Sequence, residues 1–420
     1  MDPTHPGAIS PVYFMNQTEP YSSKISAELQ RYADQEEVHD LPAIYHFWSE
    51  RYCLPLLQEV GFDGLEDFLD QHVAEQCARR APERARLVSL GAGNGDTEIG
   101  IASRLRDRGI ENLELTLLEL NPQMLERAVA DANKLGLTDR VIARQTDLNS
   151  WKADSNADVY LANHSLHHVV NLEGLFTEVK ASLDPEGVLL VNDMIGRNGH
   201  VRWPEAADLL RRIWDVAPED YRWNPFLRGV EDVYPDIDCS TSGFEGIRAQ
   251  DILPLLLERF HPDVYICFLN VADPFIDRVY GPNFDVNSPE DRAFIDALGR
   301  FDDAAIDLQL VTPTHLIGSF RTQPVQCRYP RRRSPARTMR SVDESPVPLA
   351  TVDAVRSSTD QPDTNQDTAR EALVAELELS LDESRTRYEH LRHRKAVRVA
   401  LKLAAARHWR PARRLAREAH

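Results

Sequence analysis

Three alternating glycines, Gly91, Gly93 and Gly95, separate a short apolar run from a helical pattern. Glycine allows the backbone to turn sharply and to approach a ligand that a Cβ atom would repel. The helix N-terminus behind the glycines offers unpaired N–H groups to a negative group. The next apolar run, residues 113–119, ends in Glu119, whose carboxylate could accept both hydroxyls of a ribose. This arrangement predicts a nucleoside-containing cofactor at the carboxyl edge of a parallel sheet.

Strand and helix patterns alternate over residues 85–196, which is the rhythm of parallel strands joined by crossover helices. The helix after the second strand is marked by Asn121 as its cap and by Gly136 at its end. A segment rich in aromatic residues and proline, residues 197–260, then interrupts this rhythm. Strand character returns in two further segments, residues 264–269 and 308–320. The pattern predicts an α/β domain with a doubly wound sheet and a helical insertion.

The glycine loop departs from the dinucleotide-binding fingerprint, which requires a third glycine where this chain has Asp96. Its spacing instead resembles motif I of class I S-adenosylmethionine-dependent methyltransferases. Three later segments resemble the same family in the same order: residues 144–148, 158–168 and 187–193. One departure is Ser89, where many members of the family carry an acid two residues before the first glycine.

The resemblance implies a Rossmann-like methyltransferase sheet of seven strands whose last strand is antiparallel. It also implies S-adenosyl-L-methionine as the cofactor, with Glu119 at the ribose and Asp147 at the adenine. The residues that the resemblance places around the cofactor are Gly91, Ala92, Gly93, Gly95, Glu119, Leu120, Asp147, Leu148 and Asn163.

Methyl transfer from a sulfonium is an in-line displacement, so the enzyme must mainly align the nucleophile with the methyl group and exclude water. An oxygen nucleophile also needs a general base or a neighbour that orients it, and histidine suits proton removal near neutral pH. The family builds its acceptor side from the loops after the fourth and fifth strands. The candidate catalytic residues in these loops are His164, His167, His168, Asp193 and His200.

These candidates also have structural interpretations. His167 and His168 could pack against and cap the helix that follows the fourth strand, and Asp193 could cap the loop at residues 194–200. The histidines could also suggest a metal ion. Adjacent histidines do not easily share one ion, however, and metal-dependent members of the family use clustered acidic ligands. No metal site is therefore expected.

The acceptor is less constrained by the sequence. The insertion at residues 197–260 and the N-terminal helices resemble a lid over the cofactor. Several residues of the insertion could grip an anionic or sugar-like substrate or could instead belong to the core: Arg202, Trp203, Tyr221, Trp223, Arg228 and Arg248. Residues 244–253 and 273–277 are similar to segments of uncharacterised bacterial methyltransferases found near polysaccharide-synthesis enzymes. This similarity favours methylation of an oxygen on a small molecule or on a sugar or glycan intermediate.

Two other classes of function remain open at this point. The chain could be a catalytically inactive cofactor-binding scaffold, although a scaffold need not keep an intact glycine loop and Glu119. A nicotinamide-dependent oxidoreductase is disfavoured by Asp96 and by the antiparallel pattern of the final strand.

The chain has 420 residues and a formal net charge of −19. Residues 323–420 contain 20 Lys and Arg against 13 Asp and Glu, so the preceding part of the chain is strongly acidic. An acidic body repels phosphates, and no nucleic-acid partner is expected. The five cysteines form no C-x-x-C pair, and the chain shows neither a signal-peptide pattern nor an apolar run of roughly 20 residues. A cytoplasmic location is therefore expected.

These patterns divide the chain into four predicted parts. Residues 1–80 form a helical N-terminal cap, residues 81–322 the methyltransferase domain with its lid insertion, residues 323–368 a disordered linker and residues 369–420 a helical tail. The tail begins with an acidic, coiled-coil-like repeat and ends in a basic stretch, residues 392–417, with ten Arg or Lys and no acid. That stretch is expected to be solvated, to dock on an acidic protein surface or to contact an anionic membrane weakly.

Overall fold

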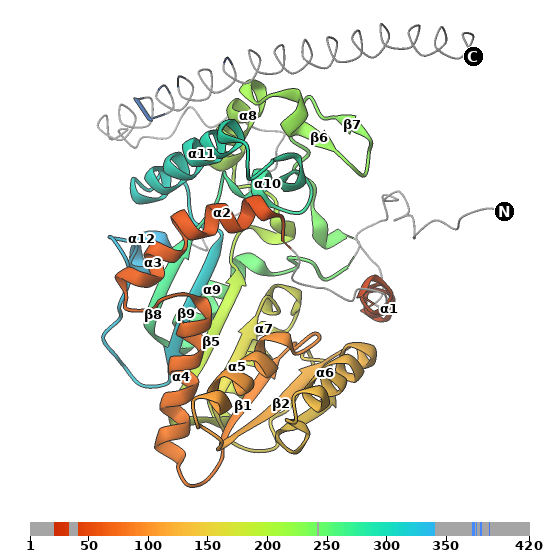
Figure 1. Cartoon of the computed structure of the whole chain (residues 1–420), viewed down its shortest axis with the longest axis vertical. Helices are drawn as coiled ribbons and strands as arrows, with labels where there is room; N and C mark the ends of the chain where they lie inside the picture. Colours follow the sequence, from red (N-terminus) through yellow and green to blue (C-terminus); the bar gives the residue numbers. More distant parts are fainter. Residues whose placement is uncertain are drawn as a thin grey trace, which may run out of the picture.

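The computed structural model describes residues 21–32, 41–241 and 243–340, together with isolated positions between residues 372 and 386. Its centre is a seven-stranded sheet with the strand order β3-β2-β1-β4-β5-β9-β8 (Figure 1). Strands β1 to β5 run parallel, whereas β9 is antiparallel to its neighbours β5 and β8. The bounds are β1 Ala85–Leu90, β2 Leu113–Glu119, β3 Val141–Gln145, β4 Ala157–Asn163, β5 Leu183–Met194, β8 His261–Phe268 and β9 His315–Arg321. The predicted doubly wound sheet with an antiparallel last strand is confirmed.

Helices cover both faces of this sheet. One face packs against α4 (Leu65–Arg80), α5 (Asp96–Asp107) and α6 (Pro122–Lys134), and the other packs against α7 (Leu172–Ser182) and α9 (Ala249–Arg259). Successive residues of a strand point to opposite faces. In β4, Val159 and Leu161 therefore pack with the first group of helices, and Tyr160 and Ala162 pack with the second. The carboxyl ends of the parallel strands meet at one edge between these two layers.

The capping signals at α6 behave as the sequence predicts. Asn121 is the N-cap residue, and its side-chain oxygen accepts a hydrogen bond of 3.0 Å from the backbone N–H of Gln123. Gly136 follows the helix with a positive φ of 69°, which a glycine adopts without steric cost. The helix is therefore held by local chemistry as well as by its packing on β2 and β3.

Two insertions lie beyond the carboxyl edge of the sheet (Figure 1). The first follows β5 and contains α8 (Pro204–Val216) and a hairpin of β6 (Trp223–Asn224) and β7 (Gly229–Val230). The second joins β8 to β9 and contains α10 (Asp273–Ile276) and α11 (Pro289–Asp307). The N-terminal helices α2 (Ala43–Tyr52) and α3 (Leu54–Glu59) complete this part of the molecule, and α2 packs against α11.

The second insertion differs from the sequence-based expectation. A strand was expected over residues 308–320, but β9 begins only at His315. The preceding residues follow the long helix α11, whose N-cap residue Ser288 accepts a hydrogen bond from Asp291 N through its side chain. The expected first insertion at residues 197–260 also includes α9, which belongs to the helix layer packed on the sheet.

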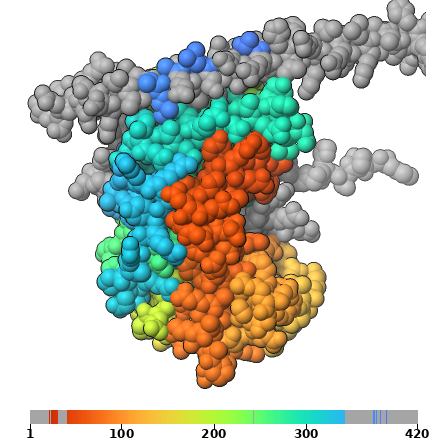
Figure 2. All heavy atoms as spheres, turned by 60° about the vertical axis from the view of Figure 1, so that its left-hand side comes forward, coloured from red at the N-terminus to blue at the C-terminus, as the bar shows by residue number. Residues whose placement is uncertain are grey.

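The chain stays packed beyond the last strand. Residues 323–340 lie against the domain, and the segment ends in a short helix, α12 (Pro335–Thr338). The Arg328 side chain donates to Val60 O at 3.2 Å beside the end of α3, and Figure 2 shows this part of the chain next to the N-terminal helices. The expected start of a disordered linker at residue 323 is therefore too early.

A buried arginine is one of the residues that hold this segment on the domain. The Arg333 side chain is 1% exposed and pairs with Asp303 at 2.8 Å and Asp307 at 2.7 Å, both on α11. It also donates to Cys267 O at 3.3 Å, at the end of β8. A segment with few apolar residues is thus held on the domain by buried ion pairs.

The remainder of the expected linker and almost all of the expected helical tail, including the basic stretch at residues 392–417, lie outside the described residues. Among the described residues, no helix combines the length and apolar character needed to cross a membrane.

Arg333 provides a test of this packing. Arg333→Ala removes the buried member of this ion-pair network and leaves Cys267 O and Asp303 O without the donor that Arg333 supplies, so it should lower the free energy of unfolding by about 3 kcal/mol. Arg331→Ala is the matched control, because Arg331 pairs with the same two aspartates but is 33% exposed. It should cost about 1 kcal/mol or less. Urea denaturation of both variants measures the difference, and equal losses would contradict the assigned role of burial.

Candidate active site

The glycine loop connects the carboxyl end of β1 to the N-terminus of α5. Gly91, Gly93 and Gly95 have positive φ values of 78°, 55° and 71°. A Cβ atom built on Gly91 would lie 2.7 Å from Cβ of Ser165, which belongs to the loop after β4. Glycine is therefore required at position 91 both by the backbone conformation and by the close approach of that second loop.

Glu119 stands at the end of β2 and holds the glycine loop. One carboxylate oxygen accepts a hydrogen bond of 2.9 Å from Gly93 N, and the other accepts one of 2.9 Å from Asn121 N. Each oxygen has further acceptor capacity. The carboxylate thus lies where a ribose would meet the glycine loop, with its orientation fixed by two backbone groups.

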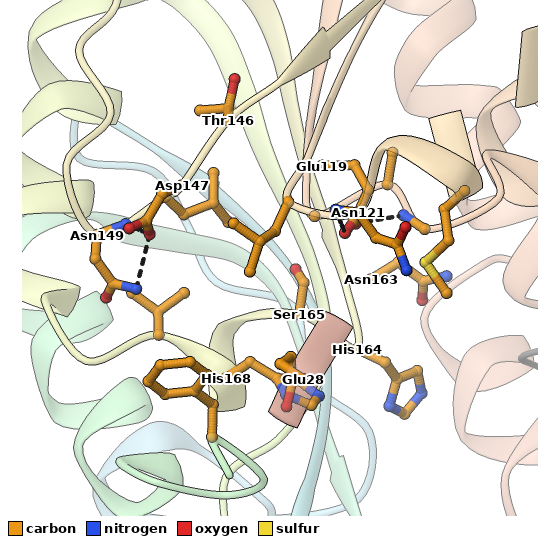
Figure 3. Close-up of a pocket in the computed structure, with 18 of the residues that line it drawn as sticks. Glu28, Glu119, Asn121, Thr146, Asp147, Asn149, Asn163, His164, Ser165 and His168 are labelled. Carbon is orange, nitrogen blue, oxygen red and sulfur yellow. Dashed lines mark hydrogen bonds and ion pairs between the residues drawn. The ribbon is translucent and has the colours of Figure 1, made fainter. Parts of the chain in front are cut away.

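A cavity of about 160 Å³ opens in front of these residues (Figure 3). It lies between the carboxyl ends of the parallel strands, the helix α1 (Tyr21–Tyr32) and Phe244 of the first insertion. The residues expected around the cofactor that line it are Gly91, Ala92, Gly93, Glu119, Leu120, Asp147, Leu148 and Asn163. Gly95 lies behind the cavity as the N-cap residue of α5.

Asp147 is tied to the N-terminal helix. Its carboxylate accepts hydrogen bonds from Tyr21 OH at 2.7 Å and from the backbone N–H of Asn149 at 2.9 Å. Burial and the hydrogen bond to Asp147 raise the pKa of the Tyr21 hydroxyl well above its usual range, so the tyrosine is a neutral donor. Helix α1 therefore covers the side of the cavity at which the adenine was expected.

A buried acid, Glu98, lies beside the glycine loop. Glu98 belongs to α5, is 2% exposed, lines the cavity and accepts a hydrogen bond of 2.7 Å from Ser89 Oγ. Burial raises the pKa of its carboxyl to about 7, although the hydrogen bond from Ser89 acts in the opposite direction. A buried carboxyl of the following helix thus lies next to position 89, where the sequence itself has no acid.

The two adjacent histidines after β4 point to different surroundings. His168 lines the cavity together with His164, and its Nδ1 lies 2.8 Å from Oε1 of Glu28 on α1. His167 is buried, and its Nδ1 lies 2.5 Å from Oδ1 of Asp193. Of this pair, only His168 is among the residues that line the cavity.

Asp193 is fully buried at the end of β5 and organises the loop after β4. Its Oδ2 accepts hydrogen bonds from Ser165 N at 2.9 Å and Leu166 N at 2.7 Å. Burial alone would raise the pKa of Asp193, but the charge of His167 outweighs it and lowers the value to about 2. Asp193 therefore holds the loop after β4 in place, and it also accepts a hydrogen bond of 2.8 Å from Met194 N, at the start of the loop that the sequence expected it to cap.

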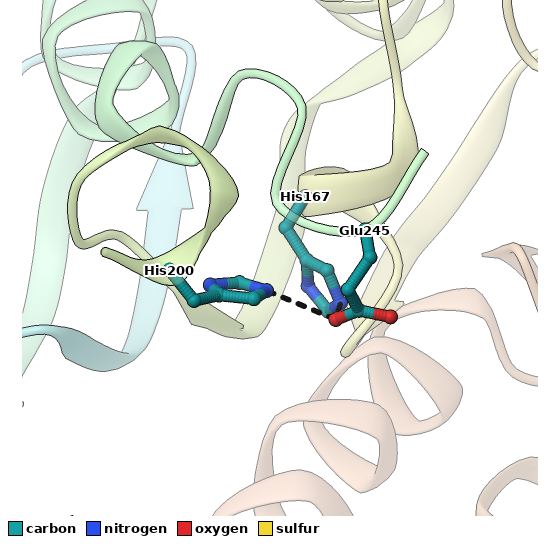
Figure 4. Close-up of side chains that lie close together, drawn as sticks. All are labelled: His167, His200 and Glu245. Atoms are coloured by element: carbon teal, nitrogen blue, oxygen red, sulfur yellow. Dashed lines mark hydrogen bonds and ion pairs between the residues drawn. The ribbon is translucent and has the colours of Figure 1, made fainter. Parts of the chain in front are cut away.

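His167 and His200 converge on Glu245, a residue of the first insertion (Figure 4). Oε1 of Glu245 lies 2.9 Å from Nε2 of His200 and 3.4 Å from Nε2 of His167. The three ligand atoms lie within 4.8 Å of one another, which is a geometry that could hold a metal ion. Burial lowers the pKa of His167, but Asp193 and Glu245 outweigh it and raise the value to about 10.

Sequence reasoning missed Glu28 and Glu245. Glu28 lies 140 positions before His168 in the chain and reaches it through the placement of α1. Glu245 lies within the segment 244–253 that was singled out for its resemblance, but its carboxylate had no assigned role. Neither residue has a local motif, so only the fold brings them to the histidines.

Three of the six basic and aromatic residues expected to grip a substrate contact carboxylates of the scaffold. Arg202 is buried and pairs with Asp273 at 2.7 Å, and Arg248 pairs with Glu173 at 2.6 Å. Tyr221 OH donates to Asp291 at 2.8 Å. Each of these three side chains therefore already has a carboxylate partner on a neighbouring element, and Arg202 needs its partner because it is a buried charge.

Glu98 generates a prediction about stability and pH. Its carboxyl pKa is about 7 in the folded chain against an ordinary value of 4.5, so its stabilising contribution is complete below pH 4.5 and is lost as the pH rises through 7. Glu98→Gln resembles the protonated acid. It should match the wild type near pH 4.5 and exceed its free energy of unfolding at about pH 8 by roughly 3 kcal/mol.

Urea denaturation at the two pH values measures this effect. The control is Glu126→Gln, which removes an exposed carboxylate from α6 and should follow the wild type at both pH values. A Glu98→Gln variant with no gain at the higher pH would show that the buried carboxyl does not titrate as inferred.

Comparison with known proteins supports the same domain. Residues 83–222 match the family model of the methyltransferase domain. The 27-O-demethylrifamycin SV methyltransferase of Amycolatopsis mediterranei (strain S699) is 26% identical over 161 residues, which are 32% of this chain and 57% of that protein. Polyketide synthase PksR of Bacillus subtilis (strain 168) is 25% identical over 194 residues, which are 44% of this chain and 7% of that protein. The chain thus spans less than two thirds of either relative.

Solved structures are more distant. The O-methyltransferase from a trans-AT PKS multienzyme of Brevibacillus brevis, in complex with S-adenosyl-L-homocysteine, is 13% identical, with coverage of 69% of this chain and 85% of that chain and a TM-score of 0.36. A likeness at this distance does not identify a substrate.

The family follows from the sheet and the site together. The antiparallel β9, the glycine loop clamped by Glu119 and the match over residues 83–222 agree, whereas the dinucleotide fingerprint is broken at Asp96. Residues 83–222 therefore form a methyltransferase domain whose sheet and glycine loop are those of the class I S-adenosylmethionine-dependent type.

Proposed function

We propose that the enzyme transfers the methyl group of S-adenosyl-L-methionine to a hydroxyl oxygen of a small, polyketide-like molecule. The observation that carries this proposal is the cavity, which has the glycine loop and Glu119 at one end and His168 at the other. Its two curated relatives, a methyltransferase of 27-O-demethylrifamycin SV and a polyketide synthase, support this class of acceptor. Neither name mentions a sugar or glycan, so the glycan acceptor suggested by the sequence has no comparable support.

The cofactor would lie along the carboxyl edge of the sheet. Glu119 would accept the ribose hydroxyls, and Asp147 would face the adenine after exchanging its contact with Tyr21. Glu98 lies beside the glycine loop, where its carboxylate would contact the ammonium group of the methionine part. Ala92, Leu120, Leu148 and Asn163 would complete the walls around the cofactor.

The chemistry requires the acceptor oxygen to meet the methyl carbon in line with the departing sulfur. S-adenosyl-L-methionine would supply an electrophilic methyl group, with the neutral thioether S-adenosyl-L-homocysteine as the leaving group. His168 would accept the hydroxyl proton, with Glu28 orienting its imidazole at 2.8 Å. The helix α1 and Phe244 would exclude water from this step. Asp193, His167 and His200 would act by positioning the loop that carries His168.

The proposed ribose contact predicts the effect of Glu119→Ala. Loss of charge-assisted hydrogen bonds should weaken S-adenosyl-L-methionine binding by roughly 1–3 kcal/mol, as measured by isothermal titration calorimetry. Glu114→Ala is the control, because Glu114 lies on the same strand and pairs with Arg86 at 3.5 Å. It should bind the cofactor like the wild type. Unchanged affinity in Glu119→Ala would place the ribose elsewhere.

The proposed base predicts a separate effect for His168→Ala. Turnover should fall by about 100-fold or more, since a positioned general base typically contributes that much, while cofactor affinity and melting temperature should remain near those of the wild type. Calorimetry and thermal denaturation provide these two controls. If affinity, stability and turnover fall together, His168 has a structural role.

The acceptor class is tested with methyl-labelled S-adenosyl-L-methionine. The full chain is incubated with a panel of hydroxylated polyketides, including 27-O-demethylrifamycin SV, and with a matched panel of sugars and oligosaccharides. We expect label in an ether of a polyketide, identified by mass spectrometry. Label transferred only to the sugar panel would overturn the proposed acceptor while leaving the cofactor assignment intact.

A further inference from the structure

Three potential metal ligands from separate segments converge beside the cavity (Figure 4). His167 belongs to the turn after β4, His200 to a 3-10 turn after β5 and Glu245 to the loop before α9. Oε1 of Glu245 lies 2.9 Å from Nε2 of His200 and 3.4 Å from Nε2 of His167. Figure 4 shows both imidazoles pointing toward this carboxylate.

We propose that His167, His200 and Glu245 bind one divalent transition-metal ion, with Zn²⁺ as the ion best suited to this ligand set. Zinc prefers imidazole nitrogen and carboxylate oxygen in a tetrahedral arrangement, and two histidines with one glutamate leave the fourth position for water or another oxygen ligand. Ligands about 2 Å from such an ion lie roughly 3–3.5 Å from one another, close to the two separations from Glu245. The proposal goes beyond methyl transfer and does not depend on the acceptor.

The surroundings of His167 favour a metal ligand. Its Nδ1 is held 2.5 Å from Asp193, which leaves Nε2 directed at Glu245. A carboxylate behind a ligating histidine fixes the ring and makes its other nitrogen a better donor, which is the usual support for histidine in metal sites. Asp193 is itself held by Ser165 N and Leu166 N.

The charges in this cluster are consistent with a divalent cation. Asp193 is fully buried and Glu245 has 23% of its side chain exposed. Both carboxylates face histidines: Asp193 pairs with His167, and Glu245 lies near His167, His168 and His200. A cation with two positive charges between them would balance the two carboxylates, because buried charges are stable only when they are paired or bound to a metal.

The ion would connect the first insertion to the sheet. His167 precedes His168, and Glu245 follows Phe244, and both of these neighbours line the cavity. A bond from one ion to His167, His200 and Glu245 would therefore fix the wall of the cavity opposite the glycine loop. The site would thereby hold in place the part of the cavity wall that contains His168 and Phe244.

Metal content and affinity test the proposal directly. The full chain is stripped with a chelator and titrated with Zn²⁺ by calorimetry, and bound metal is counted by elemental mass spectrometry. We expect one tightly bound equivalent. Glu245→Gln and His200→Ala should each weaken Zn²⁺ binding at least tenfold, whereas His261→Ala, which removes an exposed histidine from β8, should have no effect.

A second readout identifies the ligands. Co²⁺ substituted for Zn²⁺ should give visible absorption of a tetrahedral site in the wild type and in His261→Ala, and this absorption should be lost in Glu245→Gln. Binding of S-adenosyl-L-homocysteine by every variant serves as the check of folding and of the cofactor site. The proposal is overturned if the wild type binds no stoichiometric Zn²⁺, or if folded Glu245→Gln and His200→Ala bind it as tightly as the wild type.

Discussion

The buried carboxylate of Asp193 is the interaction on which the site depends. It stands at the end of β5 and accepts backbone hydrogen bonds from Ser165 and Leu166, so it holds the loop that follows β4. That loop places Cβ of Ser165 where it would lie 2.7 Å from a side chain at Gly91. The glycine loop can therefore approach the loop after β4 this closely only because residue 91 has no Cβ atom. One carboxylate thereby links the acceptor side of the cavity to the cofactor side.

The parts of the fold that the sequence predicted are those encoded by nearby residues. A turn glycine, a helix cap such as Asn121 and an apolar strand each determine the structure of residues close to them in the chain. The sheet and its carboxyl edge could therefore be predicted from the order of these local signals. Glu119 could be placed because a strand end fixes where its carboxylate lies. The residues of the cavity wall that were missed, Glu28 above all, come from helices whose position depends on the packing of the whole domain.

Composition misled the prediction wherever ion pairs replaced apolar contacts. Residues 323–340 contain too few apolar residues to predict a packed segment, yet Arg333 is buried between two aspartates of α11. Arg202 and Arg248 suggested an anionic substrate because a sequence does not show whether an arginine already has a carboxylate partner. Their carboxylate partners lie 71 and 75 residues away in the chain.

The two adjacent histidines of the loop after β4 have different contacts. Because residues 166–168 form a 3-10 turn, His167 is directed toward Asp193 and Glu245 while His168 faces the cavity and Glu28. The objection that neighbouring histidines do not share an ion therefore does not apply, since the second histidine of the cluster is His200 from another loop. A single short turn carries both the group that would receive the acceptor's proton and a group that ties the insertion to the sheet. Glu245 lies 3.4 Å from Nε2 of His167 and 3.7 Å from Nε2 of His168, so the insertion is in contact with both histidines of this turn.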